Sequence, residues 1–140
     1  DFPACLEFLS IFVRHHLLIA ALMKFSLEQD DNVVVFTINE NRLDSLVAPD
    51  LKAELLIVCQ PDIDALILDL SKIDYADSTG LSCLLLAHRQ LKDHNVPVIL
   101  IGVRETVRNL LRLSQMEWLF TFFDTKEQAF RDMQDDGAGE

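Results

Sequence analysis

The stretch ALILDLSKIDYADSTGL, residues 65–81, contains an apolar run, a polar loop and the start of a helical pattern in direct succession. The run at 65–70 is almost wholly apolar, which is typical of a parallel strand covered on both faces. After the loop, one face of a predicted helix extends to about Asn95. Its residues are Leu81, Leu84, Leu85, His88 and Leu91. A second apolar run at 96–102 completes a predicted βαβ unit with two central, parallel strands.

Upstream of this unit the sequence predicts a hairpin and a helix. The segment 32–38 is short and rich in β-branched residues, and a polar turn separates it from residues 24–28. This pattern is typical of two strands joined as a hairpin. Pro49 stands where the first turn of a helix accepts proline, and apolar residues then recur at helical spacing as far as Pro61. We therefore expect a helix that ends near Gln60.

Downstream of Gly102 the pattern predicts a third helix, a short strand and a closing helix. The third helix has an apolar side, with Val107, Leu110, Leu111 and Ser114, and a side that we expect to face water, with Arg104, Arg108 and Arg112. The strand is expected at 118–123 and the last helix at 125–133. Together the segments predict an α/β fold, with a mixed sheet of four to five strands and about four helices mainly on one face.

The domain organisation follows from length and composition. The chain has 140 residues, half of them hydrophobic, which suits one compact domain, and we place that domain at 23–130. Residues 1–22 are expected to be an extension outside it, either the product of an upstream start or an appended helix. Their apolar residues are interrupted by charges, so no transmembrane span is expected. Residues 131–140 are expected to be a solvated tail.

Charge and cysteine usage exclude several classes of function. A formal net charge of −11 would repel a phosphate backbone, so we expect no direct nucleic-acid binding. The three cysteines, Cys5, Cys59 and Cys83, have no metal-binding spacing, which fits a reducing cytoplasm. Cys59 and Cys83 lie within helical patterns, so we expect them to be small apolar packing residues. No glycine-rich loop is present to hold a nucleotide. Neither a metal nor a cofactor is expected.

The loop after the first apolar run holds the candidate site. Ser78 is expected in the first turn of the following helix, where backbone N–H groups and the helix dipole favour an anion. A phosphate on Ser78 would add roughly −1.5 to −2 charges at neutral pH. Because Asp74 and Asp77 are close in sequence, that charge would make the surface repulsive to a partner while the fold persists. Alternatively, Ser78 is a helix cap and nothing more.

The motif Asp77-Ser78-Thr79-Gly80-Leu81, placed after a buried strand that ends in Asp69-Leu70, resembles the phosphorylation-site pattern of the STAS family. Arg42-Leu43-Asp44 is similar to the Gly-Arg-Leu-Asp turn of that family, with Asn41 in place of glycine. Ser82 stands where a second glycine is frequent. The resemblance covers about residues 23–130.

This resemblance implies an anti-sigma-factor antagonist, a protein-binding switch that is not itself an enzyme. Its implied partners are an anti-sigma factor that is also a serine kinase and a phosphatase that restores the hydroxyl. Ser78 is then the phosphoacceptor, and Asp77, Thr79, Gly80 and Leu81 are partner-binding residues. Asp77 would orient the hydroxyl or contact the kinase, and Gly80 would let another backbone come close.

Two other functions compete with the switch. A hydrolase would use Ser78 as nucleophile and His88 as base, but the Gly-x-Ser-x-Gly elbow is absent and His88 lies about 15 Å along the same helix. We therefore expect His88 to be a residue at the edge of the core. The other alternative is a STAS subunit that regulates a membrane transporter or a lipid-export complex.

Overall fold

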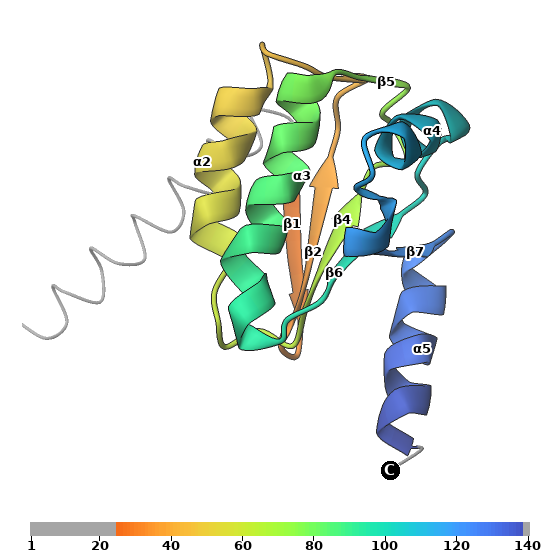
Figure 1. Ribbon diagram of the computed structural model, residues 1–140. Coiled ribbons are helices and arrows are strands. Elements are labelled where there is room, and N and C mark those ends of the chain that lie inside the picture. Colours follow the sequence, from red (N-terminus) through yellow and green to blue (C-terminus); the bar gives the residue numbers. More distant parts are fainter. Residues whose placement is uncertain (1–24, 139–140) are drawn as a thin grey trace, which may run out of the picture.

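The computed structural model describes residues 25–138, with side chains described up to residue 134 (Figure 1). Its centre is a five-stranded sheet in the order β1-β2-β4-β6-β7. The strands are β1 (Phe25–Asp30), β2 (Val33–Ile38), β4 (Ala65–Asp69), β6 (Val98–Ile101) and β7 (Thr121–Phe123). β1 pairs with β2 antiparallel, and the other neighbours are parallel. The predicted hairpin, the parallel central strands and the mixed sheet are confirmed.

Four α-helices accompany the sheet within the described residues: α2 (Ala48–Val58), α3 (Ser78–Leu91), α4 (Glu105–Leu113) and α5 (Lys126–Ala138). Side chains of α2, α3 and α4 share one hydrophobic core with one face of the sheet, whereas α5 packs on the opposite face (Figure 1). The prediction of helices mainly on one face is confirmed. α5 continues five residues beyond the expected end at Met133. The predictions for residues 1–22 lie outside the described residues.

The buried side of α3 differs only in part from the predicted one, since Leu81, Leu84 and Leu91 are buried as expected. Leu84, Ala87 and Leu91 are fully buried, while Leu85 and His88 are half-buried. Cys83 is also buried, and its thiol lies 3.6 Å from the carbonyl oxygen of Ala48 in α2. The difference arises because α3 packs against α2 as well as the sheet, which moves its buried stripe toward α2.

The last strand is shorter than predicted. A 3-10 helix occupies Glu117–Leu119, and β7 begins at Thr121. The expectation of a strand starting at Trp118 was wrong, because the chain turns through a left-handed residue at Gln115 (φ 56°) and extends only after that turn. Trp118 is left 80% exposed.

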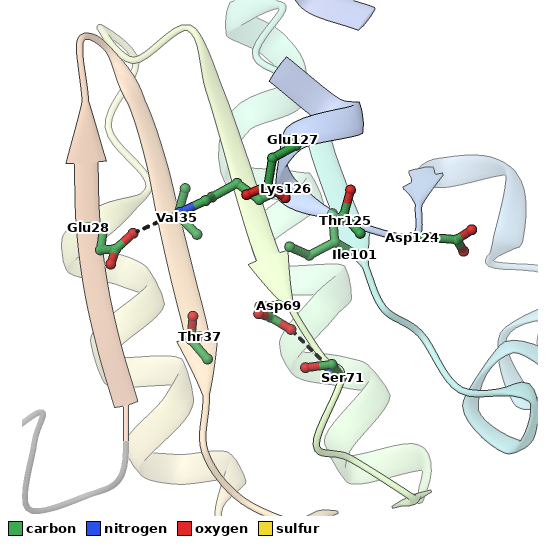
Figure 2. Close-up of a pocket in the computed structure, with 10 residues that line it drawn as sticks. All are labelled: Glu28, Val35, Thr37, Asp69, Ser71, Ile101, Asp124, Thr125, Lys126 and Glu127. Atoms are coloured by element: carbon green, nitrogen blue, oxygen red, sulfur yellow. Dashed lines mark hydrogen bonds and ion pairs between the residues drawn. The ribbon is translucent and has the colours of Figure 1, made fainter. Parts of the chain in front are cut away.

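The face of the sheet that carries α5 is incompletely covered. A cavity of about 410 Å³ lies at the carboxyl ends of the central strands, beside the first turn of α5 (Figure 2). Hydroxyl and carboxylate groups line much of it, among them Thr37, Asp69 and Ser71. An ion pair of 3.3 Å joins Lys126 of α5 to Glu28 of β1, the edge strand on the other side of the sheet from β7. Ser78 does not line this cavity.

Candidate functional site

A small second sheet supports the loop that carries Ser78. Its two strands, β3 (Arg42–Leu43) and β5 (Tyr75–Ala76), run parallel, with Arg42 opposite Tyr75 and Leu43 opposite Ala76. The N–H of Asp77 donates to the carbonyl oxygen of Leu43 at 3.2 Å, one residue beyond the ladder. The two motifs that carried the resemblance, separate in the sequence, therefore lie side by side. The sequence analysis predicted neither strand, because two-residue strands leave no periodic pattern.

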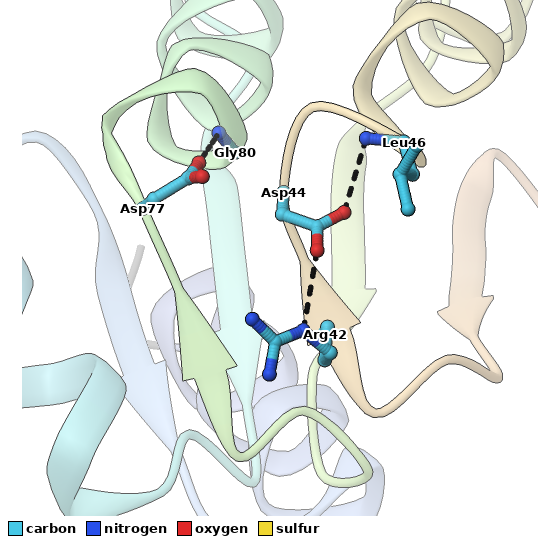
Figure 3. Close-up of polar contacts among 5 residues, drawn as sticks. All are labelled: Arg42, Asp44, Leu46, Asp77 and Gly80. Carbon is cyan, nitrogen blue, oxygen red and sulfur yellow. Dashed lines mark hydrogen bonds and ion pairs between the residues drawn. The ribbon is translucent and has the colours of Figure 1, made fainter.

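Asp77 is the residue that caps α3. Its backbone is extended (φ −120°, ψ −176°), and its carboxylate accepts a hydrogen bond from the N–H of Gly80 at 2.9 Å (Figure 3). This geometry satisfies one of the free N–H groups at the helix start. Ser78 is the first helical residue, not the cap, and its side chain is exposed, as is that of Thr79. The hydroxyl of Ser78 is open to solvent at the electropositive end of a 14-residue helix.

Gly80 and Leu81 lie inside the domain. A Cβ on Gly80 would overlap the backbone carbonyl of Leu43, so the close approach that requires glycine here is made by β3 of the same chain. Leu81 is 4% exposed and belongs to the main core. The structure thus presents Ser78 and Thr79 at the surface, half-buries Asp77 and uses the next two residues to fix α3 against β3. Partner binding by these residues stays a prediction.

Arg42 and Asp44 form a polar group beside this site. Nε of Arg42 donates to Oδ2 of Asp44 at 3.2 Å, and Oδ1 of Asp44 accepts from the N–H of Leu46 at 3.1 Å (Figure 3). The hydrogen bond from Arg42, supported by those from backbone N–H groups, lowers the pKa of Asp44. The Arg42 guanidinium also lies over the Tyr75 ring, 4.1 Å from its centre. Leu46, in the same loop, is 84% exposed.

The other residues singled out in the sequence have structural partners. His88 is half-buried and meets the ring of Phe120 edge-on, at the border of the core as expected. Arg108 is also half-buried, so it faces water only in part, contrary to the prediction of a fully solvated side: it binds Glu117 at 2.9 Å and stacks on Phe122. Arg104 and Arg112 are exposed. The guanidinium groups of Arg108 and Arg112 lower the pKa of Glu117.

The two described cysteines have the packing role predicted for them. Cys59 and Cys83 are buried and unpaired. Burial raises the pKa of each thiol to about 11, so both are un-ionised and unreactive at neutral pH. Between residues 25 and 134, no cluster of three His, Cys, Asp or Glu side chains is arranged to hold a metal ion. In the same part of the chain, no helix is long and apolar enough to cross a membrane.

The mixed sheet, the helix pair α2–α3 and the serine-bearing loop between β4 and α3 define this chain as a STAS-type α/β domain. The chain belongs to the STAS domain family, whose model matches residues 24–129. A protein of Bordetella bronchiseptica named as a candidate anti-sigma factor antagonist, BtrV, is 26% identical over 107 residues. The alignment covers 76% of this chain and 91% of that protein.

Solved structures share the fold. The anti-sigma factor antagonist SpoIIAA in its unphosphorylated form superposes with a TM-score of 0.67 at 21% identity, over 79% of this chain and 96% of that one. The phosphorylated form of SpoIIAA from Bacillus gives 0.62 at 22% identity, over 78% and 98%. The murine anion transporter Slc26a9 gives 0.67 at 14% identity, over 91% of this chain and 25% of that one. The fold of this chain is therefore that of anti-sigma factor antagonists, and some transporters contain it too.

Proposed function

We propose that this chain is an anti-sigma-factor antagonist, a protein-binding switch controlled by phosphorylation of Ser78. The observation that carries the proposal is the position of Ser78, exposed as the first residue of a helix whose cap and third residue are fixed by the domain itself. A kinase can reach this hydroxyl without unfolding the chain. The relationship to the antagonist BtrV and the fold shared with SpoIIAA support the same function.

The switch works through charge on a rigid surface. In the unmodified protein, Ser78 and Thr79 form a neutral exposed surface at the helix start, and Tyr75 of β5 and Leu46 of the loop after β3 are also exposed. The anti-sigma factor docks on this surface and releases its sigma factor. Phosphate on Ser78 adds about two negative charges beside Asp77, and desolvating that group in an interface is costly. The partner then dissociates while the domain stays folded.

The partner-binding residues divide into two kinds. Thr79 and the accessible part of Asp77 contact the partner directly, with Ser78. Gly80 and Leu81 act by holding the helix start against β3 and the core, since both are buried. The chemistry of phosphate transfer belongs to the anti-sigma kinase and to a serine phosphatase, and this chain is their substrate in the cytoplasm.

The test compares Ser78→Ala with Ser78→Asp in binding to the ATP-dependent kinase that copurifies with the chain from its native cell. We expect Ser78→Ala to bind within about threefold of the unsubstituted protein, and Ser78→Asp to bind at least about tenfold more weakly, a loss of about 1.4 kcal/mol. Ser71→Asp, which adds the same charge at an exposed site lining the α5-face cavity, is the matched control and should bind normally. Equal affinity for the two Ser78 variants refutes the charge switch.

A second function has one observation in its favour, the shared fold of the Slc26a9 transporter. In that case the chain would regulate a membrane transporter or a lipid-export complex. The two functions differ in the protein bound: an ATP-dependent kinase that phosphorylates Ser78 in vitro supports the switch. A membrane ATPase or carrier whose binding is indifferent to Ser78→Asp supports the alternative.

A further inference from the structure

The parallel pairing of β3 and β5 places Arg42 on the strand beside the segment that leads into Ser78. Leu43 and Ala76 face the core, so their neighbours Arg42 and Tyr75 project to the opposite, exposed side of the small sheet. Ser78 follows Tyr75 by three residues. The hydrogen bond between Asp77 and Leu43 brings the immediate neighbour of Ser78 against the immediate neighbour of Arg42.

The guanidinium of Arg42 has unused donors. Its Nε is taken by Asp44, and its flat face lies on the Tyr75 ring. No acceptor among the described residues takes a hydrogen bond from its two terminal nitrogens, and the side chain is 59% exposed. The stacking on Tyr75 and the bond to Asp44 hold the group in one place. Its terminal edge is therefore pre-positioned for a further acceptor, which lowers the entropy lost on binding.

The charges around Ser78 show what that acceptor would be. Asp44, Asp74 and Asp77 surround this end of the molecule, and each would repel a phosphate on Ser78. A phosphate monoester offers three strong acceptor oxygens, and a guanidinium edge binds two of them in parallel. Arg42 alone on the β3–β5 ladder supplies such an edge.

We propose that Arg42 is an intramolecular phosphate ligand, which binds phosphoserine at position 78 through its two terminal nitrogens. This inference rests on the proposed function, because it requires a phosphate on Ser78. Arg42 compensates the added charge within the domain, so the phosphorylated protein stays folded despite the three carboxylates. It also keeps the phosphate next to the loop that carries Leu46, where the group blocks the docking surface as well as repelling the partner.

The test measures the second pKa of the phosphate by ³¹P NMR, in full-length protein with phosphoserine installed at position 78 during translation. We expect this pKa to lie below the ordinary value of about 6 when Arg42 is present, because the guanidinium favours the dianion. Arg42→Gln should raise it by roughly 0.5 to 1 unit, and Arg42→Lys should restore part of the difference. Arg104→Gln, which removes an exposed arginine that binds the carbonyl of Ser71, is the matched control and should leave it unchanged.

Equal phosphate pKa values in the unsubstituted protein, Arg42→Gln and Arg104→Gln overturn the proposal. A fall in the pKa on removing Arg42 does so too. The measurement uses neither kinase nor partner, so its result is independent of the binding comparison between Ser78→Ala and Ser78→Asp. If the two Ser78 variants bind the partner equally, the proposed function fails, but Arg42 can still lower the phosphate pKa. If Arg42→Gln leaves the phosphate pKa unchanged, this inference fails, but the charge switch at Ser78 can still hold.

Discussion

The two faces of the sheet are built in different ways. On one face, α2, α3 and α4 share a continuous core with the strands, and fully buried side chains such as Leu43, Leu51 and Leu84 fill it. On the other face, Ala129 is the one buried side chain among those described for α5, and a polar cavity of about 410 Å³ remains beside the helix. Ser78 is fixed by the first face. The comparison indicates that the position of the site depends on tight packing there and is largely independent of α5.

The largest difference between the two faces should be in the free energy of unfolding lost when a buried side chain is truncated. Leu84→Ala, in the fully buried face of α3, should lower the free energy of unfolding by about 2–5 kcal/mol, because it leaves a cavity. Met133→Ala is a truncation of similar size on half-buried α5 and should cost about 1 kcal/mol, since less area returns to water. Urea unfolding measures both. Equal losses would show that the two faces are packed alike.

A smaller change in stability is expected for Gly80→Ala, and whether it is a gain or a loss tests the contact with Leu43. In an open helix position Gly→Ala stabilises by up to about 1 kcal/mol. Here the added methyl group overlaps the carbonyl of Leu43, so Gly80→Ala should destabilise by about 1–3 kcal/mol and displace α3 from β3. Thermal unfolding gives the sign, and Thr79→Ala, at the exposed neighbouring position, serves as the control with a change below about 0.5 kcal/mol. A stabilising Gly80→Ala would contradict the contact.

Removing the N-cap of α3 should lower the free energy of unfolding by about 1 kcal/mol. Asp77→Ala removes the acceptor of the Gly80 N–H and should lower stability by that amount. Asp77→Asn keeps an acceptor and should recover most of the loss. The matched control is Asp74, a nearby acid. Its backbone N–H donates to the carbonyl of Asn41, but its carboxylate has no partner among the described residues. Asp74→Ala should therefore change the free energy of unfolding by less than about 0.5 kcal/mol. Chemical denaturation of the three variants ranks them, and equal costs for Asp74→Ala and Asp77→Ala would remove the capping role.

The smallest effect is expected at the α5 face. Lys126→Gln breaks the ion pair to Glu28, whose side chains are 40% and 69% exposed, and should cost between about 0 and 1 kcal/mol. The loss should shrink further at 1 M salt, where exposed charges are screened. The affinity of this variant for the anti-sigma kinase, measured by calorimetry, should be unchanged. A large loss of binding in this variant would mean that the site extends to the α5 face.

Long periodic segments were predicted well from the sequence. The apolar runs at β4 and β6 admit one interpretation, strands covered on both sides, and their spacing around α3 leaves room for a helical crossover. The hairpin of β1 and β2 carries an equally local signal. Such elements depend on side chains close in the chain, which is why their existence and pairing were predicted correctly.

Short features, and features that depend on tertiary contacts, were not predicted correctly from the sequence. The start of β7 was placed three residues early, because Trp118 and Leu119 are apolar enough for a strand but follow a left-handed turn at Gln115. Part of the buried face of α3 was also predicted wrongly: Leu85 and His88 are only half-buried, because α3 packs against α2 as well as the sheet. The arginine of the Arg42–Asp44 pair was noted in the sequence for its resemblance alone, with no sign that it lies on Tyr75.

The sequence by itself determined the order of strands and helices, the family, and the serine predicted to carry the phosphate, because these depend on local patterns and on a contiguous motif. The tertiary structure alone decided that Asp77 caps α3, that Gly80 is pressed against Leu43, and that Arg42 lies on Tyr75, three residues before the predicted phosphoacceptor. These contacts join residues 33 to 37 positions apart or depend on the exact start of a helix. The periodic pattern of a single sequence does not indicate such contacts, because they depend on how segments distant in the chain pack together.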